Sequence, residues 1–367
     1  MKKSFLLAAL VGVALTSCTK NEPVAPAPQG ITFEVGTYAP QTRANVNLGE
    51  TITFGAYAYV SDAQTATTPQ NFMVNQEVAY GSNKWAPTTT YYWPGSFVDF
   101  ICYAPYTATV DASVPVISGT DNATLSYTGY EVPTVKANQK DLLYGDKAEN
   151  YKANATEPLA NGFDGVPTLF HHALAKINFT VATAKTEKGT APDVTTWETT
   201  INSITLSNVA TKGSISMTAT NAYPAAGATA AWAPASTVWT KAGTKANKTW
   251  SEAQVLTTTG VEYGTSETTT DFLVMPQDIA DDLTITINYT IVTTTGAGVT
   301  ITNTYEFSEK MNTFVDGTST TIDQWEMAKN YTYNITINPE GSQILFAPAV
   351  VDWTDVTGIG IGVSPIM

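Results

Sequence analysis

Charged side chains are scarce in this chain, and positive charge is scarcer than negative charge. Asp, Glu, Lys and Arg make up 14% of the 367 residues, against roughly 25% in an average soluble domain. Lys and Arg number 18 against 32 Asp and Glu, so the formal net charge is −14. Such a chain is a poor partner for nucleic acid or for an anionic lipid surface. We therefore expect no nucleic-acid partner.

Cysteine and histidine, which carry much of protein catalysis and metal binding, are almost missing. The chain has two cysteines, Cys18 and Cys102, and two adjacent histidines, His171 and His172. The side chains of adjacent residues point in different directions in a strand and in a helix, so these two histidines alone make no metal site. The sequence has no His-x-x-x-His, Cys-x-x-Cys or Gly-x-Ser-x-Gly and no glycine-rich phosphate loop. We expect no catalytic residue, metal or cofactor and no enzyme, although distant carboxylates can still meet as a glycosidase pair.

The chain has no apolar run long enough for a membrane span. Its longest apolar run lies near the start, at residues 5–15. It is too short to cross a bilayer, which takes about 20 apolar residues. Lys2 and Lys3 precede it and small residues follow, as in an export signal covering residues 1–17. Leu15-Thr16-Ser17-Cys18 resembles the bacterial lipobox, which implies cleavage before Cys18 and diacylglycerol on its sulfur. The alternative is an ordinary secretory signal followed by a stray cysteine.

The remaining chain follows the pattern of β-strands. Apolar residues alternate with polar ones, and Thr, Val, Ile, Tyr and Phe dominate, which suits half-buried strands. No long window repeats at 3.6 residues, so we predict an all-β fold of sandwich or barrel type. The predicted strands are 31–37, 51–60, 97–103, 177–181, 201–206, 283–292, 299–307 and 331–337.

Two polar stretches divide the chain. Residues 21–30 hold three prolines among small residues and are typical of an extended tether. Residues 185–195, with Gly189 and Pro192, indicate a domain boundary. We therefore predict an amino-terminal β-sandwich over 44–187 and a carboxyl-terminal one over 188–367.

Aromatic residues cluster at Trp85, Tyr91, Tyr92 and Trp93. They can form a platform for stacking sugars, but aromatic residues in a β-sandwich more often fill its core. We favour the core, and we expect Cys102, in line with Val98 and Phe100, to be a buried apolar residue.

Several short motifs together resemble the fimbrillin family, the type V pilins of bacteroidete bacteria. Their order and spacing match the family over most of the chain from Ile31. They are YYWP at 91–94, VDFICYAP at 98–105, DLLY at 141–144, LFHHALAKI at 169–177, LVMPQ at 273–277 and the segment from Trp325 to Tyr333.

This resemblance implies two transthyretin-like β-sandwich domains in tandem. It also implies export as a lipoprotein, with residues 18–43 as a lipidated propeptide that anchors the precursor in the outer membrane. An arginine-specific protease would then cut between Arg43, the one arginine of the chain, and Ala44. That cut would release the first strand, carrying Ile31, Phe33 and Val35. A strand from another subunit would fill the vacated groove, so that subunits polymerise into a fimbria that supports adhesion.

The carboxyl terminus offers a candidate donor strand. Ile359, Ile361 and Val363 alternate with glycines and repeat the pattern of Ile31, Phe33 and Val35. The alternative is a terminal strand of its own domain. Because an anchor subunit would lack the cut and a tip subunit needs no donor, we favour a shaft subunit. The competing hypotheses are a tip subunit, a surface lipoprotein that binds glycans without polymerising, and a surface hydrolase.

Overall fold

A computed structural model describes residues 30–35, 48–62, 68–135, 138–152, 165–219, 228–264, 272–314, 321–341 and 343–353. These residues form β-strands, with single-turn 3₁₀ helices at η1 (Thr120–Asn122) and η3 (Met311–Thr313). The predicted all-β class is thereby confirmed. Within the same residues, no helix combines the length and apolar character that a membrane span requires.

The largest sheet, sheet I, has 10 strands. Its strands are, in pairing order, β10 (Val166–Thr168), β1 (Phe33–Val35), β4 (Lys84–Pro87), β3 (Gln70–Gly81), β2 (Phe54–Ser61), β5 (Phe97–Ala104), β8 (Leu143–Gly145) and β11 (Phe170–His172). In addition, β9 (Lys147–Tyr151) pairs with β5 and with β16 (Ala228–Ala230). Most pairs are antiparallel, but β1 and β10 run parallel.

Sheet II covers one face of sheet I. It holds β17 (Trp232–Pro234), β15 (Lys212–Ala219), β7 (Thr124–Glu131) and β6 (Val116–Ser118), with β18 (Thr240–Lys241) beside β15. The chain therefore returns to this sheet after residue 210, because β15 pairs with β7 from much earlier in the sequence.

Two further sheets face each other. Sheet III holds β21 (Val261–Glu262), β12 (Ala175–Thr183), β27 (Lys329–Asn338), β28 (Gln343–Asp352) and β22 (Phe272–Val274). Sheet IV holds β13 (Glu187–Lys188), β14 (Thr195–Ala210), β24 (Thr284–Thr294), β25 (Thr300–Lys310), β19 (Lys245–Trp250) and β20 (Gln254–Val255). A two-stranded ribbon pairs β23 (Gln277–Asp278) with β26 (Gln324–Trp325).

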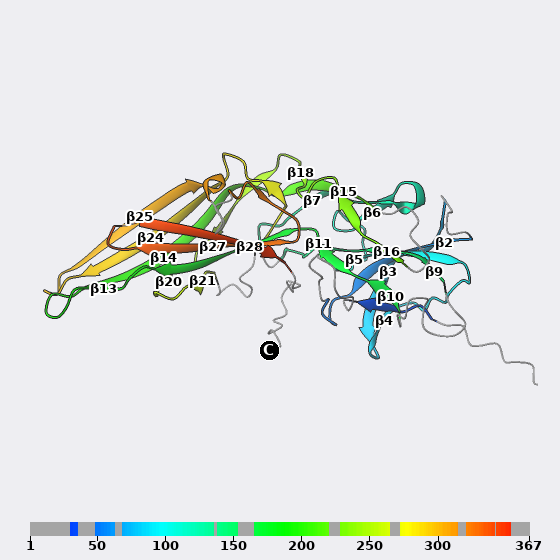
Figure 1. Cartoon of the computed structure of the whole chain (residues 1–367), viewed down its shortest axis with the longest axis horizontal. Coiled ribbons are helices and arrows are strands. Elements are labelled where there is room, and N and C mark those ends of the chain that lie inside the picture. The colour runs from blue at the N-terminus through cyan, green and yellow to red at the C-terminus, as the bar shows by residue number, and fades with distance from the viewer. Residues whose placement is uncertain are drawn as a thin grey trace, which may run out of the picture.

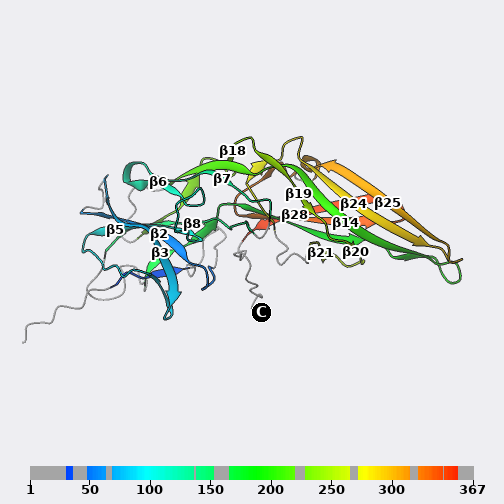
Figure 2. The ribbon, with the colours of Figure 1, turned by 180° about the vertical axis from the view of Figure 1, so that it is seen from behind.

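The described molecule is elongated (Figure 1), with sheet I toward one end, sheets III and IV at the other, and sheet II along the top between them. The reverse view in Figure 2 shows the same order. Three apolar clusters fill it. The amino-terminal core lies on one face of sheet I, the middle core between sheets I and II, and the carboxyl-terminal core between sheets III and IV.

Strand β5 shows why its sequence is so apolar. Val98, Phe100 and Cys102 point into the amino-terminal core, and Ile101 points into the middle core. Successive side chains of a strand point to opposite faces, so a strand buried on both sides needs apolar residues in succession. Cys102 is 2% exposed, which confirms its interpretation as a buried apolar residue.

All eight predicted strands are present, as β1, β2, β5, β12, β14, β24, β25 and β27. Several long strands escaped prediction, among them β3, β7, β15 and β28. In β3 the pairing with β2 shifts register, and Asn75 has a φ of 44°. Such irregularities break the alternation on which the prediction depends.

The polar stretch 185–195 lies between β12 of sheet III and β14 of sheet IV. It forms a hairpin between β13 and β14, with Lys188 opposite Thr195. The strand before it, β12, already belongs to sheet III, whereas β15 to β18 after it join sheets I and II. The division of the chain at 187/188 and its organisation in two tandem transthyretin-like domains stay predictions.

Candidate functional site

The first described strand, β1, lies inside sheet I although it comes from the start of the chain. It runs between β4 and β10, with Phe33 opposite Trp85 on one side and Val166 on the other. Backbone hydrogen bonds extend the pairing: Ile31 N donates to Tyr91 O at 2.8 Å, and Val166 N donates to Thr32 O at 2.8 Å. In Figure 1 the strands β4 and β10, which flank β1, lie at the lower edge of sheet I.

The apolar side chains of this segment belong to the amino-terminal core. Ile31 is 2% and Phe33 3% exposed, and the partly buried Val35 packs against the same cluster. The Phe33 ring lies edge-on to Phe54 at 5.4 Å and to Phe100 at 5.6 Å between ring centroids. Such edge-to-face pairs add about 0.5–1.5 kcal/mol each beyond the buried area. Phe33 is therefore the central side chain of this segment.

Gly165 brings the chain close to the backbone of β1. A Cβ atom at this position would lie 2.8 Å from the carbonyl carbon of Phe33 and 3.0 Å from its Cα. Contacts this short force atoms apart, and a backbone neighbour cannot rotate away as a flexible side chain can. The glycine thus leaves room for a strand at the position of β1.

Taking β1 away would leave a groove between β4 and β10. Trp85, Phe54 and Val166 would form its walls, and the donors and acceptors of β4 and β10 that now bond to β1 would lose their partners. Exposed apolar walls and free strand edges both favour the addition of another extended strand. The arrangement is therefore suited to binding a strand of alternating apolar residues.

All the other predicted site residues lie outside the described residues. These are the lipidation residue Cys18, the cleavage residues Arg43 and Ala44, and the donor-strand residues Ile359, Ile361 and Val363. Of the predicted set, the structure therefore places Ile31, Phe33 and Val35, which it brings together in one core.

The described chain ends on an anchored tryptophan. Trp353, which follows β28, is 1% exposed and stacks on His172 with ring centroids 3.5 Å apart and planes 8° apart. Its backbone N–H donates to Ala328 O at 2.9 Å. Trp353 is therefore fixed in the middle core.

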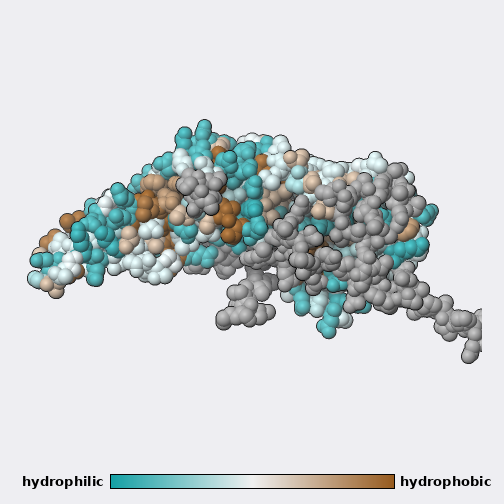
Figure 3. Space-filling view, in the orientation of Figure 1, coloured by the Kyte–Doolittle hydropathy of each residue, from teal (hydrophilic) through white to brown (hydrophobic). Residues whose placement is uncertain are grey.

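Strand β28 forms one edge of sheet III. No strand in the described part of the chain pairs with its outer edge. Aliphatic side chains of β28 are exposed, with Leu345 63% and Val351 55% exposed, and apolar surface is visible on this side of the molecule in Figure 3. Phe346 stacks on Phe307 of β25 and on Phe314, which closes this side of the sandwich. Residues 344–351 pair with β27 of their own chain.

The two histidines are buried and bind separate carboxylates. His171 Nε2 lies 3.0 Å from Asp146 Oδ1, and His172 Nδ1 lies 2.9 Å from Asp141 Oδ1. They therefore do not converge on one point. Within the described residues, no group of three or more His, Cys, Asp or Glu has the arrangement of a metal site.

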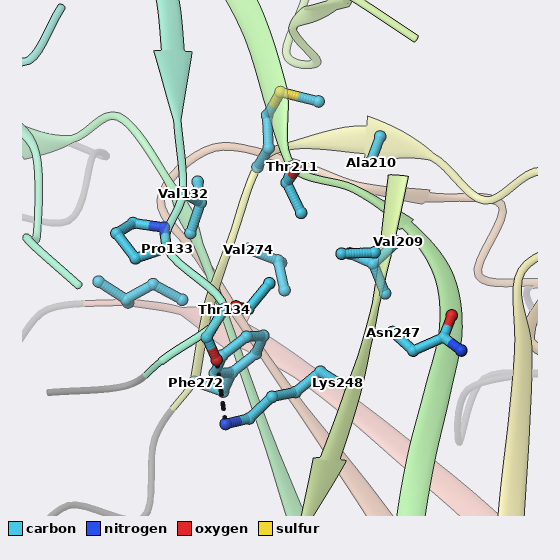
Figure 4. Close-up of a pocket in the computed structure, with 13 residues that line it drawn as sticks. Val132, Pro133, Thr134, Val209, Ala210, Thr211, Asn247, Lys248, Phe272 and Val274 are labelled. Carbon is cyan, nitrogen blue, oxygen red and sulfur yellow. Dashed lines mark hydrogen bonds between the residues drawn. The ribbon is translucent and has the colours of Figure 1, made fainter. Parts of the chain in front are cut away.

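One small hollow lies where β22, β19 and the end of β14 meet (Figure 4). Its cavity volume is about 10 Å³, room for about one water molecule. Thr211 lines it with a buried hydroxyl that has no partner among the described residues. Lys248 closes one side by donating to Thr134 O at 3.2 Å. This hollow is too small to hold a substrate.

The aromatic cluster considered as a sugar platform belongs largely to the core. Trp85 is 6% exposed, and its ring contacts Phe54 and Tyr80. Trp93 packs on Phe100. These two rings therefore do not lie flat on the surface as a stacking platform would.

No sequence pattern indicated the partner strand β10. This strand has three residues, and it pairs in parallel with a segment more than 100 residues away. Gly165, just before it, carried no signal either, because only the approach of β1 gives that glycine a role. By contrast, the clean alternation of Ile31, Phe33 and Val35 did reveal β1.

The comparisons with known proteins agree with this architecture. The fimbrillin-like family pattern matches residues 42–353. A fimbrial protein of Bacteroides vulgatus is 21% identical with a TM-score of 0.52, covering 89% of this chain and 99% of its own. A putative cell adhesion protein of Bacteroides uniformis is 18% identical with a TM-score of 0.46, covering 89% and 98%.

No curated protein matched the sequence. The likeness to the Bacteroides vulgatus protein concerns the fold. The family match covers most of the chain and begins one residue before Arg43, so that β1 lies ahead of it. The chain belongs to the fimbrillin-like family.

Proposed function

We propose that this protein is a structural pilin subunit of a cell-surface fimbria and supports adhesion without enzymatic activity. In this proposal the precursor is exported and held at the outer membrane by lipid on Cys18. An arginine-specific protease cuts after Arg43, β1 leaves, and a strand of another subunit takes its place. The observation that carries the proposal is the position of β1, buried inside sheet I yet joined to β2 by the segment that holds the one arginine of the chain.

The energetics support such an exchange. Burying Ile31 and Phe33 stabilises the precursor by about 1.5–3 kcal/mol for each side chain, and backbone hydrogen bonds to β4 and β10 add to this. A trimmed subunit that lost β1 would expose the same groove to water. An incoming strand with apolar residues at every second position would restore both the contacts and the hydrogen bonds.

The proposed donor is the carboxyl-terminal segment with Ile359, Ile361 and Val363. Its spacing matches Ile31 and Phe33, and glycines at the intervening positions would let a neighbouring chain approach closely. A subunit with both a groove and a donor can extend a polymer in two directions, which favours a position in the shaft.

The first experiment tests trimming. The purified precursor is treated with an arginine-specific protease, its new amino terminus is sequenced, and electron microscopy follows assembly. We expect a body that starts at Ala44 and forms filaments. Arg43→Lys keeps the positive charge but should stay uncut and monomeric, as should Arg43→Ala. Normal filament formation by either variant would contradict the proposal.

The second experiment tests the donor. Deleting residues 357–367 should leave a folded subunit that is still cut but no longer polymerises through that end. Ile361→Asp should act similarly, because a charge in an apolar groove is costly unless it is paired. Ile361→Val is the matched control and should assemble. A deletion that unfolds the monomer would instead assign the segment to its own domain.

A further inference from the structure

A lysine is buried among three carboxylates between sheets I and II. Lys147 of β9 is 0% exposed. Its Nζ lies 2.8 Å from Glu149 Oε1, 3.4 Å from Asp99 Oδ2 and 3.4 Å from Asp121 Oδ2. Asp99 comes from β5, the neighbour of β9 in sheet I, and Asp121 from η1. One amine thus faces three carboxyl groups with almost no access to water.

An irregularity of the sheet fixes Asp99 in this cluster. The pairing of β5 with β9 shifts register between Val98 and Phe100, at the position of Asp99. Across from it, Asn150 has a φ of 58°, and its backbone N–H donates to Asp99 Oδ1 at 2.7 Å. Bulges of this kind redirect side chains and are frequent beside functional groups. The hydrogen bond holds one oxygen of Asp99, while the other faces the amine.

The charges of the cluster do not balance. A single ammonium opposite three carboxylates leaves excess negative charge in a region of low dielectric, which favours protonation of a carboxyl group. Glu149 is 1% exposed, and its Oε2 has no hydrogen-bond partner among the described residues. Burial raises the pKa of this carboxyl group above its ordinary value. Glu149 is thus placed to hold a proton next to the amine and to exchange it.

We propose that Lys147 and Asp99 condense into an intramolecular isopeptide bond, with Glu149 as the proton carrier. Glu149 relays a proton from the Lys147 ammonium to the Asp99 carboxylate, and the resulting neutral amine attacks Cγ of the protonated Asp99. The new bond joins Nζ to Cγ, and one C–O bond of Asp99 breaks. Glu149 then takes a proton from the attacking nitrogen and gives it to the departing hydroxyl group, which leaves as water. One ammonium and one carboxylate become a neutral amide and a water molecule, so no oxidant or reductant is needed.

Asp99 is a better partner for the amine than Asp121. The backbone hydrogen bond from Asn150 withdraws electron density from Asp99 and fixes its orientation. Lys147 Nζ already donates to the backbone oxygen of Asp121 at 2.8 Å. Lys147 Nζ also donates to Asp121 Oδ2 at 3.4 Å, so two contacts with Asp121 orient the amine over the cluster. Asp121 is therefore a positioning residue.

Such a bond would tie β5 to β9 covalently. It would close a loop of the chain and so restrict the unfolded state. Strand β5 also pairs with β2 in the centre of sheet I, so the link would strengthen the sheet that holds β1. The inference does not depend on trimming or strand exchange, because the cluster lies away from β1 in the strand order.

Mass spectrometry tests the proposal directly. The full chain is purified after folding, denatured and digested with trypsin, and peptides containing Lys147 are mapped. We expect a branched peptide in which residue 147 is joined to residue 99, lighter than its two parts by the mass of one water. A linear Lys147 peptide cut at that lysine, with no branched product, would overturn the proposal. So would a branch to residue 121.

Matched variants separate the roles of the carboxyl groups. Asp99→Ala should abolish the branched peptide, whereas Asp121→Ala should retain it. Glu149→Gln keeps the size of the side chain but cannot relay the proton, so we expect the branched fraction to fall at least tenfold. Full branching in Glu149→Gln would overturn the role of Glu149. If Asp99→Ala fails to fold, the wild-type digest still decides the existence and the position of the bond.

Discussion

Replacing Phe33 by alanine tests both the structure of the precursor and its proposed maturation. Phe33 is 3% exposed and makes two edge-to-face contacts, at 5.4 and 5.6 Å. Truncating a buried phenylalanine to alanine usually costs about 3–5 kcal/mol, because apolar contacts are lost and a cavity remains. Against a typical unfolding free energy of about 5–15 kcal/mol, we expect a clear loss of stability in the precursor.

Urea unfolding of the uncut precursor measures this loss. Trp85, opposite Phe33 in the sheet, makes tryptophan fluorescence a suitable probe, with circular dichroism as a second one. Coincident transitions would support two-state behaviour and allow the free energies to be compared. A loss below about 1 kcal/mol would refute the reasoning that Phe33 fills the core, since that range is typical of surface positions.

The same substitution should leave the stability of the filament unchanged. If β1 leaves on trimming, Phe33→Ala filaments contain no trace of the change and should dissociate at the same urea concentration as wild type. Phe54→Ala is the matched control, because Phe54 lines the groove from β2 and stays in the body. It should weaken precursor and filament alike. Filaments weakened by Phe33→Ala would mean that β1 is retained.

Three further predictions concern single positions. Gly165→Ala should destabilise the precursor by about 1–3 kcal/mol through overpacking against Phe33. Gly81→Ala is the control and should change the urea midpoint little, because a Cβ there would meet nothing within 4 Å. Equal effects of the two substitutions would contradict the close approach of Gly165 to the backbone of Phe33. Trp353→Ala should cost about 3–5 kcal/mol in urea unfolding, because the ring is buried; a change below about 1 kcal/mol would show that the anchor is dispensable. Cys18→Ala should abolish incorporation of labelled palmitate, and normal labelling of that variant would exclude the lipoprotein assignment.

Local sequence patterns were sufficient to predict the class of the fold and the family. Alternating apolar residues in segments such as 201–206 and 283–292 identify strands, because a half-buried strand has a side-chain period of two. Those segments are parts of β14 and β24. The ordered motifs at 91–105 and 169–177 pointed to the fimbrillin family, which the match over 42–353 confirms.

The tertiary structure alone decided how distant segments meet. The pairing of β1 with β10 and of β15 with β7 depends on contacts between segments far apart in the chain, and no local pattern records which strands will be neighbours. Lys147, Asp99 and Asp121 likewise looked like ordinary charges along the sequence. Their meeting arises because β5 and β9 are adjacent in sheet I and η1 lies against them. Local periodicity fixes which face of a strand is buried, whereas the packing of sheets fixes what that face meets.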